Sequence, residues 1–243
     1  MKLLALDTSE QAMSVAVMED ATLLAETTLN RRMKDHSEQL LPTIESLLAA
    51  SGLGADDIDR FVVAAGPGSY TGLRIAVTTA KTFASTLHKE LVGVSSLAAL
   101  AAGERHTSEL IVALMDARRG NVFAGGYQWT DDGRLKTVIA DRHLALTEVL
   151  AQIAALGQLT VFTGPDALSM RETIVEQLGS LARFADPVSA LPRASRLGAL
   201  GRVAAPVADI DAFVPRYLRL TEAETTWLKT HQETGHEPYV EKV

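Results

Sequence analysis

The 243-residue sequence contains no cysteine, which excludes disulfide bonds, thiolate metal sites and cysteine nucleophiles together. It also lacks any apolar run near the roughly 18 residues that a membrane-spanning helix needs. The apolar stretch at the N-terminus meets Asp7 too early for the hydrophobic region of a signal peptide. We therefore expect a protein of the reducing cytoplasm that has no membrane partner.

Positive charge is scarce, since 23 Lys and Arg face 30 Asp and Glu and give a formal net charge of -7. A protein that binds nucleic acid by itself usually has a basic surplus. The basic residues gather only at 31–34 and at Arg118-Arg119, as is typical of solvated loops. Binding of tRNA or DNA by this chain alone is therefore disfavoured. The chain is 47% hydrophobic, which is enough to bury a sizeable core.

The order of predicted elements repeats along the chain. Apolar patterns in the first half predict strands at 2–7, 12–18, 23–29, 61–65 and 91–94, and helices at 35–50, 71–87 and 96–102. The second half predicts strands at 110–116, 121–127, 135–140 and 159–163, and helices at 147–156, 166–178 and 196–204. This repetition indicates two mixed α/β domains, at 1–103 and 104–213, with a tail at 214–243 that packs back on the first.

A glycine-rich segment, AGPGSYTGLR at 65–74, lies between a predicted strand and a predicted helix. This geometry presents backbone N–H groups at a helix N-terminus. The known phosphate-binding signatures are nevertheless absent, because a P-loop needs Gly where Leu73 stands and a Rossmann turn needs Gly where Thr71 stands. The segment has the form of a ligand-binding loop without the known ligand chemistry.

Four polar residues have both a functional and a structural interpretation. Ser69 is a possible nucleophile, but Pro67 and Thr71 occupy the glycine positions of a nucleophile elbow, which favours Ser69 as a helix N-cap. His36 is a possible metal ligand, but Leu40 stands where a helical zinc pair needs its second His. A carboxylate at a strand end, as at Asp7 and Asp116, is a common turn-former.

Small residues recur every four positions along the predicted helix 71–87, at Gly72, Ala76, Ala80 and Ala84. Such a ridge lets another backbone approach closely. It can pack inside its own domain or against a helix of a second chain. Because the helix 35–50 offers a broad apolar stripe, we take these two helices as the candidate interaction surface.

Several segments together resemble the bacterial TsaB (YeaZ) family. They are LALDTS at 4–9, HSEQLLP at 36–42, AGPGSYTGLR at 65–74, MDARRG at 115–120 and PRYLR at 215–219. The resemblance covers nearly the whole chain. It implies an α/β, actin-like fold of the sugar kinase and Hsp70 ATPase type, with two duplicated mixed-sheet subdomains.

The resemblance also implies a function. The chain would be an accessory, non-catalytic subunit that works with TsaD and the ATPase TsaE. Together they transfer the threonylcarbamoyl group to the adenosine next to the tRNA anticodon. The family implies a heterodimer with TsaD, with a homodimer possible without it, and contact with tRNA only within the complex. ATP or ADP and a metal ion are expected on the partner subunits, and no cofactor on this chain alone.

Departures from related enzymes support the non-catalytic role. Ser96 and Leu100 stand where TsaD carries two metal-binding His, and neither side chain can replace an imidazole on a metal. Asp7 and Asp116 occupy positions that approach metal and phosphate in actin-like nucleotidases. Ser9 replaces the glycine of the first phosphate loop, and Gly164 is followed by proline instead of a second glycine. Asp7, Asp116 and Gly164 are thus degenerate nucleotide-site positions.

The expected partner interface lies on the two first-domain helices and the turn before the second. Its residues are His36, Leu40, Ser69, Tyr70, Thr71, Gly72, Arg74, Ala76 and Ala80. A bulky residue at Ala76 or Ala80 should then break the heterodimer without unfolding the chain. Two alternatives stay open: a small-molecule kinase or ATPase that uses Asp7 or Asp116 with Mg²⁺, and a metallopeptidase.

Overall fold

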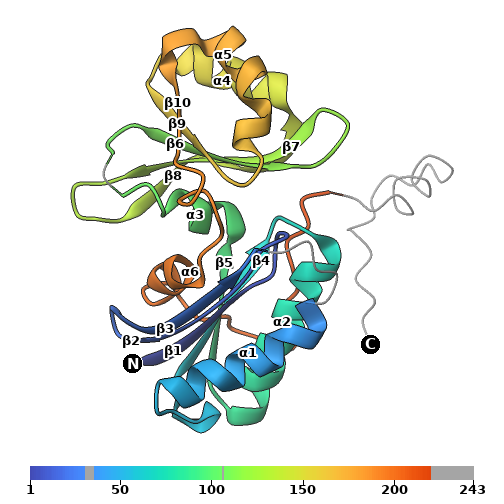
Figure 1. Cartoon of the computed structure of the whole chain (residues 1–243), viewed down its shortest axis with the longest axis vertical. Coiled ribbons are helices and arrows are strands. Elements are labelled where there is room, and N and C mark those ends of the chain that lie inside the picture. Colours follow the sequence, from blue (N-terminus) through green and yellow to red (C-terminus); the bar gives the residue numbers. More distant parts are fainter. Residues whose placement is uncertain (31–35, 106, 220–243) are drawn as a thin grey trace, which may run out of the picture.

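The computed structural model describes residues 1–30, 36–105 and 107–219, which form two five-stranded sheets (Figure 1). The strands of the first sheet lie in the order β3-β2-β1-β4-β5, and those of the second in the order β8-β7-β6-β9-β10. The first sheet contains β1 (Lys2–Asp7), β2 (Met13–Glu19), β3 (Thr22–Leu29), β4 (Arg60–Gly66) and β5 (Glu90–Ser95). The second contains β6 (Leu110–Asp116), β7 (Asn121–Trp129), β8 (Leu135–Ala145), β9 (Thr160–Thr163) and β10 (Ala182–Phe184).

The two sheets have the same topology. The central strand β1 pairs antiparallel with β2 and parallel with β4, and β6 pairs in the same way with β7 and β9. Asp7 and Asp116 therefore end equivalent central strands. The predicted α/β fold class with two duplicated mixed sheets is confirmed.

Helices cover both faces of the first sheet (Figure 1). On one face lie α1 (His36–Ala50) and α2 (Tyr70–Leu87), and on the other lies α6 (Ala194–Gly201). Successive side chains of β1 alternate between these layers, because a strand points its residues to opposite faces. Leu4 and Leu6 pack toward α1 and α2, whereas Leu3 and Ala5 pack toward α6.

The helix α3 (Ser96–Ala101) lies between the two halves (Figure 1). Its Leu97 and Leu100 pack against Ile111 and Ala113 of the second sheet. The other face of that sheet is covered by α4 (Leu146–Leu156) and α5 (Arg171–Leu178). Three short 3-10 helices are η1 (Ala55–Asp57), η2 (Ala167–Met170) and η3 (Gly179–Leu181).

Most predicted elements are found, with differences in the second half. The predicted helix 166–178 is divided into η2 and α5, because Ser169 folds back to bond the Asp166 carbonyl through both its amide and its hydroxyl. The strand β8 runs five residues beyond its predicted end, and the three-residue β10 was not predicted. The basic segment 31–34 and the tail after Arg219 lie outside the described residues.

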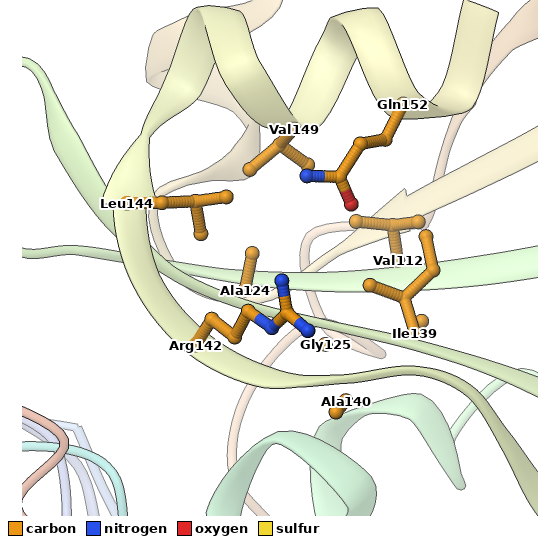
Figure 2. A pocket seen from close by; sticks show the side chains of 10 residues that line it. Val112, Ala124, Gly125, Ile139, Ala140, Arg142, Leu144, Val149 and Gln152 are labelled. Atoms are coloured by element: carbon orange, nitrogen blue, oxygen red, sulfur yellow. The ribbon is translucent and has the colours of Figure 1, made fainter. Parts of the chain in front are cut away.

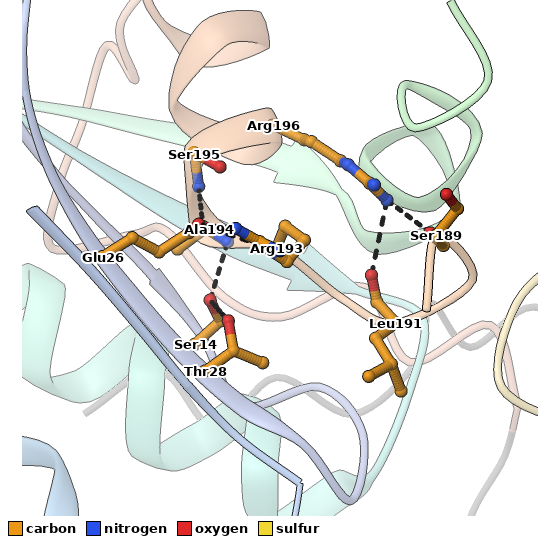
Figure 3. Close-up of polar contacts among 9 residues, drawn as sticks. All are labelled: Ser14, Glu26, Thr28, Ser189, Leu191, Arg193, Ala194, Ser195 and Arg196. Atoms are coloured by element: carbon orange, nitrogen blue, oxygen red, sulfur yellow. Dashed lines mark hydrogen bonds and ion pairs between the residues drawn. The ribbon is translucent and has the colours of Figure 1, made fainter. Parts of the chain in front are cut away.

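The predicted domain boundary at residue 213 does not match the packing, because α6 returns to the first sheet (Figure 3). Its first amides are bound by side chains of β2 and β3: Ala194 N–H donates to Ser14 Oγ at 2.9 Å and Ser195 N–H to Glu26 Oε1 at 2.8 Å. Arg193 Nε donates to the other Glu26 oxygen at 2.9 Å. The sequence carries no local signal of this long-range anchor.

Arg60 at the start of β4 holds the opposite end of α6. Its Nη1 donates to the carbonyl oxygens of Gly201 at 2.8 Å, Arg202 at 2.9 Å and Ala204 at 3.1 Å. Its Nε donates to Glu90 at 2.8 Å. These bonds satisfy carbonyls that a helix C-terminus leaves without partners. The last helix is thus fastened to the first sheet at both ends.

After α6, residues 203–219 form a strap along the first half. Val207 N–H donates to the Leu91 carbonyl at 2.7 Å, and Lys81 Nζ donates to the carbonyls of Asp211 and Phe213 at 2.9 Å each. Arg219 Nη1 then reaches the Ala117 carbonyl of the second half at 3.1 Å. No helix among the described residues is long and apolar enough to cross a membrane.

Candidate functional site

The glycine-rich segment packs against the turn that follows β1. Ser69 N–H donates to the Ser9 carbonyl at 2.7 Å, and Thr8 Oγ1 donates to the Gly72 carbonyl at 2.6 Å. A Cβ on Gly68 would lie closer than 3.0 Å to the Ser9 carbonyl oxygen. The glycines therefore let two backbones meet, which explains the motif without a bound phosphate.

Ser69 begins α2 as predicted. Its Oγ accepts the Gly72 N–H at 3.3 Å, and its carbonyl accepts the Leu73 N–H at 2.8 Å. Both contacts are those of a helix N-cap. The N-cap interpretation of Ser69 is confirmed.

Asp7 is buried, and Oδ1 of its carboxylate accepts the Ser9 amide at 2.9 Å and the Ser9 hydroxyl at 2.7 Å. Burial raises the pKa of Asp7 above its ordinary value, although the two Ser9 bonds act in the opposite direction. Asp116 has the same turn-forming contact, since its Oδ1 accepts the Arg118 N–H at 2.8 Å. Its own amide donates to Asp166 Oδ2 at 2.8 Å.

Glu10 is a half-buried carboxyl group that faces this acidic region. Burial, with the nearby charges of Asp166, Asp7 and Asp116, raises the pKa of Glu10 to about 8. Glu10 is therefore mostly protonated at neutral pH. Among the described residues, no group of three His, Asp or Glu is arranged to hold a metal ion.

Gly164 follows β9 and also serves packing. Its φ of +111° lies in the range that favours glycine, and an added Cβ would lie closer than 3.0 Å to the Leu114 carbonyl oxygen. A phosphate loop needs free backbone N–H groups, but the Ser9 and Ser69 amides are bonded within the chain. Asp7, Ser9 and Gly164 therefore all make close contacts within the chain.

A cleft of about 570 Å³ separates the two halves at the N-terminus of α2. The first half contributes residues 68–71 and Glu10, and the second half contributes 116–118 and Phe123. Tyr217 and Arg219 of the strap also line the cleft. Its width therefore depends on how the two halves are held.

A second depression, of about 450 Å³, lies between α1 and α2. We call it the α1–α2 groove, and it is lined by Ser37, Leu40, Leu41, Tyr70, Thr71, Arg74, Ile75, Thr78 and Thr79. Leu41 is 54% exposed and Tyr70 is 47% exposed. Arg74 Nη1 donates to the Tyr70 hydroxyl at 2.8 Å. Exposed apolar side chains on both helices give this surface the character of a docking site.

The structure divides the expected interface residues into two groups. Ser69, Tyr70, Thr71 and Arg74 are exposed, and His36 is half-buried with its Nε2 at 3.0 Å from the Gln11 carbonyl. Leu40, Gly72, Ala76 and Ala80 are buried within the chain. Tyr70 and Thr71 line both the groove and the cleft, so the two surfaces meet there.

The expectation for the small-residue ridge is therefore wrong. Ala76 and Ala80 are completely buried and face the first sheet, not a second chain. The reason is topological: α2 connects the parallel strands β4 and β5, and such a crossover helix must cover the sheet. A bulky residue at Ala76 would overpack the core and would not be selective for a partner.

Five groove residues were not predicted as interface positions, namely Ser37, Leu41, Ile75, Thr78 and Thr79. Leu41 belongs to the apolar stripe of its helix, but its exposure depends on how α1 rests on the sheet. Tyr217 was not predicted as an interface residue either, although it lies in the PRYLR motif of the family resemblance. Its ring stacks on that of Tyr70, with centroids 4.6 Å apart.

Ser96 and Leu100, the two positions that the family resemblance relates to metal-binding His of TsaD, lie inside the fold. Ser96 is buried, and its hydroxyl has no hydrogen-bond partner among the described residues. Leu100 is part of the core between α3 and the second sheet.

Comparison with known proteins places the chain in a family. The family model "TsaD: tRNA N6-adenosine threonylcarbamoyltransferase" matches residues 22–227. The tRNA threonylcarbamoyladenosine biosynthesis protein TsaB of Bacillus subtilis is 38% identical over 232 residues, which are 96% of this chain and 100% of that protein. The chain belongs to the TsaB family. The predicted family is thereby confirmed, and it favours the tRNA-modification hypothesis over the small-molecule kinase.

Further TsaB relatives agree with this assignment. The Escherichia coli TsaB is 35% identical over 135 residues, 55% of this chain and 58% of that protein. The structure of YeaZ from Pseudomonas aeruginosa superposes with a TM-score of 0.73 at 27% identity, over 89% of this chain and 99% of that one. A second Pseudomonas aeruginosa structure, described as similar to peptidase YEAZ, gives 0.77 at 28% identity, over 90% and 99%.

Proposed function

We propose that this TsaB-family chain is an accessory subunit in the synthesis of threonylcarbamoyladenosine in tRNA, and that it binds the catalytic subunit TsaD through the α1–α2 groove. The observation that carries the proposal is the contrast between two surfaces. The groove exposes apolar side chains on two helices, whereas the cleft has its loop amides and carboxylates bonded internally.

The chemistry of the groove suits a helical partner. Leu41 and Ile75 supply apolar contact, and Arg74 and Tyr70 supply hydrogen-bonding groups at the end nearest the cleft. An interface with an apolar centre and a polar edge is typical of specific complexes. The equivalent helices of TsaD, a relative by the family match, would lie across this groove. A second copy of the chain would use the same surface in the absence of TsaD.

The absence of catalysis by this chain is also part of the proposal. Ser96 and Leu100 cannot bind a metal ion, and Asp7 is already bonded to Ser9. We infer that ATP or ADP and the metal ion belong to TsaD and to the ATPase TsaE. With a net charge of -7, the chain would meet tRNA only within the assembled complex.

The test is the affinity of the purified chain for TsaD, measured by titration calorimetry. Leu41→Glu places a charge in the groove and should weaken binding at least tenfold, because a desolvated unpaired charge costs more than about 1.4 kcal/mol. Val175→Glu is the matched control, since Val175 is an exposed residue of α5 in the second half. Equal binding by both variants would rule out the groove as the docking surface.

The kinase alternative has a separate test. Hydrolysis or transfer of phosphate from ATP by the isolated chain, lost in Asp116→Ala, would support it and would contradict an accessory role. The proposal expects no ATP turnover above that of a blank without protein. This should hold for the parent chain and for the variants used in the binding test.

A further inference from the structure

A carboxylate joins the two halves of the molecule. Asp141 of β8 accepts a hydrogen bond of 2.6 Å from the hydroxyl of Ser95, which ends β5 of the first sheet. Its other oxygen accepts a bond from the hydroxyl of Tyr127 on β7. The two hydroxyl oxygens are 3.3 Å apart, so three side chains form one compact cluster.

The backbone of the second sheet is irregular where it presents this carboxylate. Ala124 pairs with Arg142 and Gly126 pairs with Ile139, so two steps along β7 match three along β8. The extra residue on β8 is a β-bulge, which re-aims a side chain. Gly125 completes the site, because a Cβ there would lie closer than 3.0 Å to both Asp141 Oδ1 and the Tyr127 hydroxyl.

The irregularity leaves a small void behind it (Figure 2). The void measures about 10 Å³, close to the space of one water molecule. Its walls include Gly125, Ala140 and Arg142 of the two strands and Val149 and Gln152 of α4. The two strands and α4 therefore leave a small space between them at the bulge.

Ser95 has a second role that links the cluster to the connecting helix. Its Oγ accepts the Ala98 N–H at 3.1 Å and so acts as the N-cap of α3. The same hydroxyl donates its hydrogen bond to Asp141. The helix α3 follows β5 directly and packs into the second half. Burial and the nearby Asp141 charge raise the pKa of Tyr127, which keeps its hydroxyl a donor. A rotation of one half against the other must stretch the Ser95–Asp141 bond, because Ser95 ends a strand of the first sheet and Asp141 belongs to the second.

We propose that Asp141 is a latch that fixes the angle between the two halves and therefore the width of the cleft. Ser95 and Tyr127 are its two hydroxyl partners, one from each half. The cleft walls support this role, because Ser69 and Thr71 belong to the first half and Asp116 and Arg118 to the second. The proposal concerns the isolated chain and does not depend on the proposed function.

The test measures the distance between the halves directly. The chain has no cysteine, so Thr86→Cys on α2 and Glu172→Cys on α5 provide two exposed attachment points for spin labels. Pulsed electron resonance then gives the distribution of distances in the labelled chain. With Asp141→Ala, we expect the distribution to broaden or to shift by several ångströms. An unchanged distribution would overturn the proposal.

Two controls separate a latch from a general loss of stability. Asp132→Ala removes an exposed carboxylate whose partners Thr130 and Arg134 lie in the same half. Leu150→Ala removes a completely buried side chain of α4, so it lowers the melting temperature without touching the cluster. Both should keep the distribution of the parent chain. Broadening in Leu150→Ala equal to that in Asp141→Ala would show that destabilisation alone is responsible.

Ser95→Ala keeps the test valid if Asp141→Ala fails to fold. It removes the hydrogen bond to Asp141 that crosses between the two halves. Amide exchange at Ala98 and at 139–143 should then become faster by about tenfold, because a hydrogen bond to a charged group has been lost. If both the exchange rates and the distances match those of the parent chain, Asp141 is not a latch.

Discussion

The hydroxyl of Thr8 donates a 2.6 Å hydrogen bond to the carbonyl of Gly72, and the Thr8 carbonyl fills the space where a side chain of residue 72 would be. This contact joins the turn after β1 to the first turn of α2. It explains why the glycine-rich segment resembles a ligand loop while its glycines serve internal packing.

Gly72→Ala should destabilise the fold. Its Cβ would lie closer than 3.0 Å to a backbone oxygen that cannot move independently. We expect a loss of roughly 1–3 kcal/mol in the free energy of unfolding, measured by urea denaturation. Gly54→Ala is the control, because its added Cβ meets nothing nearer than 3.7 Å. Equal losses in both variants would contradict the packing role of Gly72.

Glu26→Gln should loosen the N-terminus of α6. Burial alone would raise the pKa of Glu26, but hydrogen bonds from Arg193 and Ser195 outweigh it and lower the pKa below 4.5. A carboxyl whose pKa is lower in the folded state stabilises the fold above pH 4.5 and loses this effect as the pH falls. At pH 7 we expect a loss of about 1–3 kcal/mol on urea unfolding.

The pH dependence provides the internal check for Glu26. The difference in unfolding free energy between parent and Glu26→Gln should shrink as the pH falls below about 4.5. Asp132→Asn, in an exposed pair with Arg134, should show no measurable loss at either pH. A difference that persists unchanged at low pH would mean that the charge of Glu26 is not responsible.

Arg60→Met should loosen the other end of α6. It leaves the carbonyls of Gly201, Arg202 and Ala204 without their donor. Each buried acceptor without a partner is costly, so we expect a loss of about 2–4 kcal/mol in calorimetric or urea unfolding. Arg183→Met removes a more exposed pair with Glu109 and should cost less than about 1 kcal/mol. Similar losses for both arginines would contradict the anchoring role.

Glu10→Gln should stabilise the chain at alkaline pH. The pKa of Glu10 is about 8 in the folded state against 4.5 ordinarily, so the folded chain holds the proton more tightly. Its contribution to stability therefore falls as the pH rises from 4.5 to about 8. At pH 9 we expect the variant to gain on the order of 1 kcal/mol, less than the full pKa shift implies because Glu10 is partly exposed and solvent screens its charge. At pH 4 we expect no gain. Glu45→Gln, at an exposed position in the middle of α1, should leave the free energy of unfolding unchanged at both pH values.

The strands of the fold could be predicted because their apolar runs are long. The repeated order of elements at Asp7 and Asp116 also indicated the duplication. The N-cap role of Ser69 followed from local cap chemistry. The strand β10 was not predicted, because three residues are too few to show an alternation of apolar and polar side chains.

The positions that join distant segments could not be predicted. Ala76 is buried against the sheet, yet a row of small residues looks the same whether it meets a sheet or a partner helix. No local sequence pattern at Glu26 predicts its contact with the helix that begins at Ala194, and none at Asp141 predicts its bond with Ser95. Such contacts depend on how the halves fold together, which local patterns do not encode.

The most direct test of an accessory subunit is reconstituted tRNA threonylcarbamoylation with purified TsaD, TsaE, substrate and tRNA. We predict that modification fails when this chain is omitted and returns when it is added. Leu41→Glu should restore little activity, whereas Val175→Glu should restore it fully. Modification that proceeds equally well without this chain would contradict the account.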